Sequence, residues 1–126
     1  MNPIVVIPAR MASTRLPGKP LADIAGTAMI VRVWRQARAA NIGEVVVAAA
    51  EREICDAIEK DGGKAVLTTP DLPSGSDRVF EALEKIDPSA KHDVVVNLQG
   101  DLPALVDGDR LVIKQEGLDL AFIRED

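Results

Sequence analysis

The sequence is poor in aromatic residues, cysteine and histidine. Aromatic residues make up 2% of its 126 residues and tyrosine is absent, so the core has to be built from Val, Ile, Leu and Ala. The one cysteine, Cys55, excludes an intrachain disulfide framework. The one histidine, His92, has no second histidine or cysteine nearby with which to hold a metal ion, so we expect it to be structural. A reducing, cytoplasmic setting fits this composition.

Excess positive charge and long apolar runs are missing as well. The formal net charge of −5 argues against a general nucleic-acid partner and against adsorption to anionic membranes. No apolar run approaches the ~18 residues of a membrane-spanning helix. No apolar stretch follows a basic one at the N-terminus. We therefore expect neither membrane insertion nor a signal peptide.

Two common phosphate-binding fingerprints are also absent. No G-x-G-x-x-G follows an expected strand, which argues against a dinucleotide site of that type. Gly18 and Lys19 are followed by Pro20, where a P-loop has Ser or Thr, and the upstream glycine is missing.

What the sequence does contain is a regular alternation of apolar runs and helical periods. Short continuous apolar runs predict buried strands over 3–8, 44–49, 65–68 and 94–96. Between them, apolar residues at helical spacing predict helices from about Ala28, over 51–61, and from a cap at Ser74 or Ser76 onward. The expected apolar face of the third helix is Val79, Phe80, Leu83 and Ile86.

This order predicts an α/β fold with an open, mostly parallel sheet and helices on both faces. The length allows one domain with a real core. We assign residues 1–103 to this unit. The tail, 104–126, stays unassigned, with a hairpin between 111–114 and 118–123 as its expected structure.

Unusual polar segments follow three of the four expected strands, over 9–19, 69–78 and 99–101. Ligands of such sheets bind beyond the carboxyl ends of the strands, so the three segments predict one shared site.

The first of these segments carries three cations, Arg10, Arg15 and Lys19, and no Asp or Glu lies between Pro8 and Ala22. Cations without nearby carboxylates suit a polyphosphate. An ordinary surface loop with solvated cations is the alternative.

The third segment ends in a carboxylate, Asp101. A carboxylate facing phosphates needs a divalent ion between them, and Mg²⁺ asks for only one or two protein carboxylates. A turn residue or cap is the alternative role for Asp101.

Three stretches together resemble one enzyme family, the 3-deoxy-manno-octulosonate (Kdo) cytidylyltransferases, or CMP-Kdo synthetases. Ile7–Leu21 resembles the family's opening signature. Ser74–Arg78 (Ser-Gly-Ser-Asp-Arg) is similar to its Ser-Gly-Thr-Glu-Arg segment. Val96–Pro103 is similar to its Asn-x-Gln-Gly-Asp-Glu-Pro segment. The likeness covers residues 1 to about 103, the N-terminal portion of the family.

The resemblance implies a Rossmann-like nucleotidyltransferase that uses CTP, Kdo and Mg²⁺ to make CMP-Kdo and pyrophosphate for lipopolysaccharide biosynthesis. It implies a homodimer for the full-length family. The catalytic residues it implies are Arg10, Lys19 and Asp101, with Asp101 as metal ligand. The nucleotide-binding residues it implies are Pro8, Ala9, Arg10, Arg15, Lys19, Ser74, Gly75, Arg78 and Gln99.

The sequence departs from the family in three places. Ala49 and Ala50 replace a Thr-Asp pair, Leu102 replaces a Glu, and the chain has about half the family length, so the fold is incomplete relative to the family. Two alternatives therefore stay open: a cytidylyltransferase for another acid sugar such as neuraminic acid, and a catalytically incomplete nucleotide-binding or assembly module.

Overall fold

The computed structural model describes residues 2–11, 23–24, 27–92, 94–98, 106–107, 110–111 and 121–123. The three helices are α1 (Met29–Ala39), α2 (Arg52–Lys60) and α3 (Gly75–Ile86). The four strands that form the body of the sheet are β1 (Pro3–Ala9), β4 (Glu44–Ala49), β5 (Lys64–Leu67) and β6 (Val94–Asn97). The short strands are β2 (Asp23–Ile24), β3 (Thr27–Ala28), β7 (Val106–Asp107), β8 (Arg110–Leu111) and β9 (Ala121–Ile123). The predicted alternation of strands and helices is confirmed.

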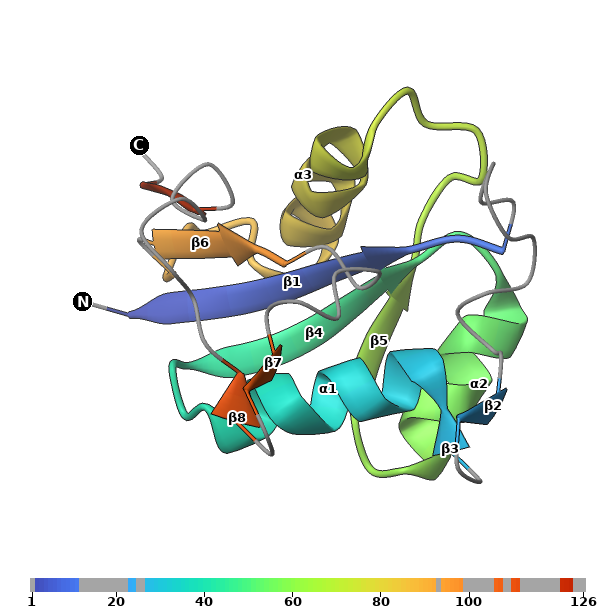
Figure 1. Cartoon of the computed structure of the whole chain (residues 1–126). Helices are drawn as coiled ribbons and strands as arrows, with labels where there is room; N and C mark the ends of the chain where they lie inside the picture. The colour runs from blue at the N-terminus through green and yellow to red at the C-terminus, as the bar shows by residue number, and fades with distance from the viewer. Residues whose placement is uncertain are drawn as a thin grey trace.

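The main sheet has five strands in the order β5-β4-β1-β6-β9 (Figure 1). The pairs β5·β4, β4·β1 and β1·β6 are parallel, and β9 is antiparallel to β6. β1 is central because it is apolar along its whole length, with Ile4–Ile7 fully buried. Strands that are buried on both faces read as continuous apolar runs, which is why the sequence showed no alternation there.

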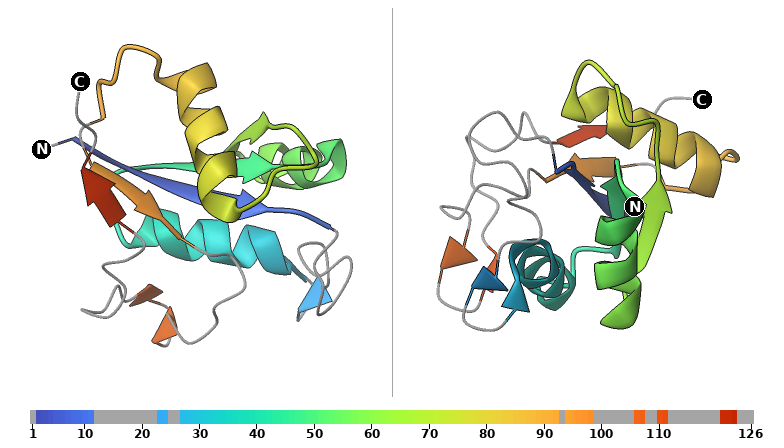
Figure 2. Two further views of the ribbon diagram at one scale, coloured as in Figure 1. Left: turned by 90° about the horizontal axis from the view of Figure 1, so that it is seen from above. Right: turned by 90° about the vertical axis from the view of Figure 1, so that its right-hand side faces the viewer.

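Helices cover both faces of the sheet, as predicted (Figure 1). α1 and α2 pack on one face, where Val5, Ile7 and Val47 meet Trp34 and Ile58. α3 packs on the other face, and the turned views of Figure 2 show the same layers. No helix among the described residues is long and apolar enough to cross a membrane.

The buried face of α3 differs from the prediction. Val79 and Leu83 are buried as expected, but Phe80 is 52% exposed and Arg78 is only 2% exposed. Arg78 lies four residues before the buried Ala82, on the stripe that faces the sheet. Phe80 falls outside this stripe because successive residues of a helix are rotated by about 100°. The helix therefore buries an arginine and exposes an aromatic ring.

The described parts of the tail form two short antiparallel pairings. Val106 pairs with Leu111 in the ladder of β7 and β8. Ala121–Ile123 pairs with β6 at the edge of the main sheet. The expected hairpin between 111–114 and 118–123 falls largely outside the described residues and stays a prediction.

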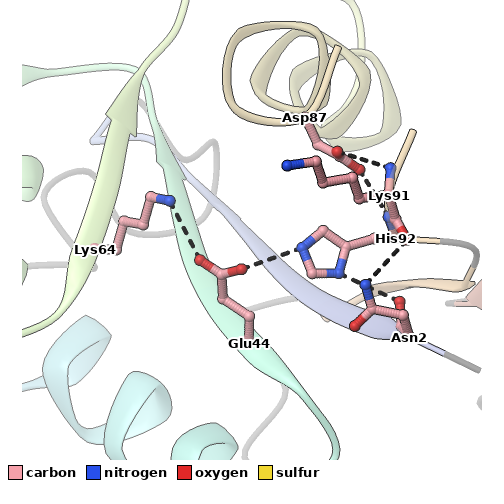
Figure 3. A network of polar contacts seen from close by, with 6 residues as sticks. All are labelled: Asn2, Glu44, Lys64, Asp87, Lys91 and His92. Atoms are coloured by element: carbon pink, nitrogen blue, oxygen red, sulfur yellow. Dashed lines mark hydrogen bonds and ion pairs between the residues drawn. The ribbon is translucent and has the colours of Figure 1, made fainter. Parts of the chain in front are cut away.

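A polar network closes the amino ends of the strands (Figure 3). His92 Nε2 lies 3.1 Å from Glu44 Oε2, and its Nδ1 lies 3.2 Å from the main-chain carbonyl oxygen of Asn2. Lys64 Nζ pairs with Glu44 Oε1 at 3.2 Å. The Asp87 carboxylate accepts the main-chain N–H groups of Lys91 and His92, both at 2.9 Å. His92 thus ties β4 to the start of β1, the kind of structural role expected from the sequence.

Candidate functional site

Three parallel strands end together at the carboxyl edge of the sheet. Ala9 of β1 pairs with Ala49 of β4, and Ala49 pairs with Leu67 of β5. β6 ends earlier, since Asn97 pairs with Val6. The segments that follow β1 and β5, two of the three that make up the predicted site, therefore leave the sheet at the same edge. The third predicted segment, 99–101, lies outside the described residues.

The main-chain carbonyls at the end of β1 point in turn to the two neighbouring strands. The Ala9 carbonyl accepts the Ala50 N–H at 3.0 Å, so it is already used. The Val6 carbonyl accepts the Leu98 N–H at 3.0 Å. Main-chain groups of a parallel strand point alternately to its two sides. The Pro8 carbonyl therefore points to the β6 side. It is the next carbonyl on that side after that of Val6, which accepts the Leu98 N–H. Of the two predicted main-chain contacts, Pro8 is the better placed.

Arg10 follows directly and is exposed. Within the described part of the chain, no carboxylate forms an ion pair with it. A charged side chain of this kind suits an anion that arrives from solution, as the sequence predicts for Arg10.

Ser74 and Gly75 form the start of α3. The Ser74 hydroxyl accepts the Asp77 N–H at 3.2 Å and donates to Asp77 Oδ2 at 2.8 Å. The predicted cap is thus confirmed, and it commits the Ser74 side chain to the helix. What remains for a ligand is the main chain, since the first N–H groups of a helix have no partner within the helix. Ser74 and Gly75 accordingly stay predictions as main-chain contacts.

Arg78 lies behind this segment, in contact with the loop after β5. Its Nη1 donates to Thr68 Oγ1 and to the Thr69 carbonyl, both at 2.7 Å, and its Nη2 donates to the Pro70 carbonyl at 3.1 Å. The Thr68 hydroxyl in turn donates to the Ala49 carbonyl at 2.8 Å. The guanidinium therefore holds the loop against the end of β4. Its predicted contact with a nucleotide stays untested.

The same loop is held a second time by Glu81. Its carboxylate accepts the Thr69 hydroxyl at 2.7 Å and the Thr69 N–H at 2.5 Å. These hydrogen bonds, the hydroxyl first, hold the pKa of Glu81 below its ordinary value. Arg78 and Glu81 are three residues apart and therefore lie on the same side of α3. Arg78 binds the carbonyl of Thr69, and Glu81 binds its N–H.

The charges of this edge influence one another. Burial lowers the pKa of Arg78, the Glu51 carboxylate opposes that effect, and the Arg10 cation adds to it. Glu51 and Arg10 therefore both lie within electrostatic reach of Arg78 at this edge of the sheet.

Two polar residues of this edge escaped the sequence reasoning. Glu51 Oε1 accepts the Met11 N–H at 2.9 Å. Asn97 is buried, and its Nδ2 donates to Ser76 Oγ at 3.2 Å, which joins β6 to the first turn of α3. Their place in the sequence could have indicated them, because each is the first polar residue after the apolar run of an expected strand.

Four predicted site residues, Arg15, Lys19, Gln99 and Asp101, lie outside the described residues. In the described ranges no group of three or more His, Cys, Asp or Glu residues is arranged to hold a metal ion. A phosphate-bound Mg²⁺ needs only one or two protein carboxylates. Its fit to this chain therefore depends on Asp101, which stays a prediction.

The chain is similar to known cytidylyltransferases. A family model described as Cytidylyltransferase matches residues 4–115. The chain is 68% identical over 104 residues to the 3-deoxy-manno-octulosonate cytidylyltransferase of Parvibaculum lavamentivorans, covering 82% of this chain and 40% of the relative. It is 70% identical over 106 residues to the protein of the same name from Rhodospirillum rubrum, covering 84% of this chain and 42% of the relative.

Solved structures give the same result. A structure of CMP:2-keto-3-deoxy-manno-octonic acid synthetase complexed with CTP matches with a TM-score of 0.72 and 43% identity, over 80% of this chain and 41% of that one. A cytidylyltransferase from Leptospira borgpetersenii matches with a TM-score of 0.65 and 30% identity, over 85% and 44%. The chain spans about two fifths of the length of the curated relatives it matches. The match over residues 4–115 covers most of its sequence, and the chain therefore belongs to the cytidylyltransferase family.

Proposed function

We propose that the protein to which this chain belongs transfers the cytidylyl group of CTP to Kdo and releases pyrophosphate. The observation that carries the proposal is the 68–70% identity to proteins named for this activity. The exposed Arg10, without a carboxylate partner among the described residues, supports an anionic substrate at the carboxyl edge.

In the proposed reaction, the anomeric hydroxyl oxygen of the sugar forms a bond to the α-phosphorus of CTP. The bond from this phosphorus to the oxygen that bridges to the β-phosphate breaks, pyrophosphate leaves, and the hydroxyl proton passes to solvent. Arg10 and Lys19 would bind and orient the phosphates, with Arg15 beside them. Pro8, Ser74, Gly75 and Gln99 would frame the nucleotide. Holding the reactants in line accounts for much of the rate of such transfers.

Mg²⁺ belongs to this proposal, with Asp101 as its protein ligand. When bound, the ion would neutralise charge that develops on the phosphate oxygens. A cytoplasmic setting is part of the proposal too, and is compatible with the free, buried Cys55. So are a homodimer of the full-length protein and a role in lipopolysaccharide biosynthesis.

A pyrophosphate-release assay tests the reaction. We expect turnover with CTP, Mg²⁺ and Kdo in the full-length protein, with the Rhodospirillum rubrum relative as a parallel control. Asp101→Asn should abolish the Mg²⁺-dependent turnover, and Lys19→Ala should raise the KM for CTP. Turnover with neuraminic acid and none with Kdo would replace the sugar in the proposal.

A second candidate function is that of a nucleotide-binding module without catalysis. The described residues proposed to contact the nucleotide lie in this chain, which matches about two fifths of the length of its relatives. Calorimetry with CTP on this chain, beside the pyrophosphate assay, separates the two. CTP binding without turnover would support the module, and turnover by this chain alone would exclude it.

A further inference from the structure

Glu51 stands at the junction of β4 and α2, and its carboxylate does not cap its own helix. It is the N-cap residue of α2, and its main-chain carbonyl accepts the Ile54 N–H at 3.2 Å, but no side-chain capping bond forms. The usual capping side chains are Ser, Thr, Asp and Asn. The Glu51 side chain instead extends to the Met11 N–H, at 2.9 Å. It therefore joins the end of β4 to the segment that follows β1.

The hydrogen bond between Met11 and Glu51 holds β1 and β4 together beyond their last paired residues. Ala9 and Ala49 end the ladder, and the Ala50 N–H then donates to the Ala9 carbonyl at 3.0 Å. The Met11–Glu51 bond follows, two residues further along the chain from Ala9. The main chain of Arg10 is thus held on both sides, while its side chain is exposed. A cation whose main chain is already fixed loses less entropy on binding an anion than a mobile one.

We propose that Glu51 is a positioning residue of the anion site: by accepting the Met11 N–H it holds the main chain of Arg10 and presents the Arg10 guanidinium to the phosphates of a nucleoside triphosphate. The identity of the nucleotide rests on the proposed function, whereas the bond between Glu51 and Met11 does not.

The negative charge of Glu51 acts against anion binding, whereas its hydrogen bond to Met11 favours anion binding. A carboxylate near an anion site repels the anion, so removing that charge should tighten phosphate binding. Removing the hydrogen bond should weaken it. Two substitutions separate these effects, because Glu51→Gln keeps an oxygen acceptor at the same length and removes only the charge. Glu51→Ala removes both.

The test titrates this chain with CTP and, separately, with inorganic tripolyphosphate, and follows the exchange of the Met11 amide hydrogen by NMR. We expect Glu51→Ala to speed exchange of the Met11 amide hydrogen at least tenfold. The same variant should bind each ligand about tenfold more weakly, the equivalent of one lost hydrogen bond. Glu51→Gln should leave exchange near the wild-type rate and bind both ligands at least as tightly as wild type. Glu53→Ala, an exposed site in the first turn of α2 that removes the same charge, should change neither readout.

Three results would overturn the inference: unchanged Met11 exchange in Glu51→Ala, tighter binding in both Glu51 variants, or a wild-type chain that binds neither ligand. If the wild type binds tripolyphosphate but not CTP, and Glu51→Ala weakens that binding, the positioning role stands and the proposed function of the chain fails.

Discussion

The two ends of the sheet treat their charges in opposite ways. At the amino edge, the carboxylate of Glu44 is shared by Lys64 and His92, as Figure 3 shows. At the carboxyl edge, Arg78 is bound by neutral oxygens alone, and Arg10 is exposed with no carboxylate paired to it in the described ranges. At the amino edge the charges are therefore paired with each other, whereas at the carboxyl edge, where Glu51 and Glu81 also lie, Arg10 has no carboxylate paired to it among the described residues. This exposed cation supports the proposal that a chain with a net charge of −5 binds an anion.

The largest effect that tests this comparison should come from Arg78. Arg78→Met removes the bonds to Thr68, Thr69 and Pro70 and leaves their oxygens without this donor. We expect the free energy of unfolding to fall by about 2–4 kcal/mol, measured by urea denaturation. Arg52→Met, an exposed arginine in α2, should cost no more than about 0.5 kcal/mol. Equal effects of the two substitutions would mean that the buried arginine does not hold the loop.

Arg10 should show the complementary behaviour, a loss of binding without a loss of stability. Arg10→Ala is expected to weaken CTP binding about tenfold or more, because a charge-assisted hydrogen bond to phosphate is lost. The free energy of unfolding should change by no more than about 0.5 kcal/mol, since the side chain is exposed. Lys91→Ala removes the same charge at the amino edge and should leave CTP affinity as it was. Similar losses in both variants would show that overall charge, and not the carboxyl edge, attracts the nucleotide.

A smaller effect should follow from pH at Glu81. Hydrogen bonds from Thr69 hold the pKa of this carboxyl below its ordinary value of 4.5. Its ionised form therefore stabilises the folded loop at higher pH, and this stabilisation is lost as the pH falls below 4.5 and through the folded-state value. NMR should show weaker protection of the Thr69 amide hydrogen, relative to its intrinsic exchange rate at each pH, over that range in the wild type. Glu81→Gln should remove this dependence, and Glu84→Gln, at an exposed position of α3, should keep it.

The smallest effect is expected at the amino edge. Glu44→Gln breaks an exposed ion pair with Lys64 and weakens the contact with His92. The free energy of unfolding should fall by less than about 1 kcal/mol, and CTP affinity should not change. A clear loss of CTP affinity would show that the amino edge also affects nucleotide binding, and would contradict the division of roles between the two edges.

Much of the fold could be predicted from the sequence because its strands are continuous apolar runs. β4, β1 and β6 lie inside the sheet and are largely buried, and such strands have a distinctive composition. The run at 65–68 was also expected to be buried, but β5 is an edge strand and only partly covered, with Leu67 38% exposed. The antiparallel addition of β9 could not be predicted, since it depends on which edge of the sheet is open. The sequence of the tail carries no sign of that edge.

For the candidate site, the sequence predicts a place on the sheet but little of the local geometry. The rule that ligands bind beyond the carboxyl ends of parallel strands located Arg10 and the start of α3. It could not distinguish an exposed cation, such as Arg10, from a buried one that holds a loop, such as Arg78. The helical spacing of Arg78 with Ala82 was the available signal for its burial. Because charged residues are seldom buried, the prediction placed Phe80 on the apolar face and left Arg78 out of it. The reach of Glu51 to Met11 depends on tertiary structure alone.

The central place of β1 also has a consequence for how the chain is made. β1 is synthesised before β4 and β6, the two strands that flank it in the sheet. β6 follows only after all three helices have been translated. At about 5–20 residues per second, the apolar segment Ile4–Ile7 waits for seconds on the ribosome before both of its hydrogen-bonding edges can be covered. This segment, which forms the centre of the finished sheet, is therefore the one that nascent chains must protect longest from pairing with each other.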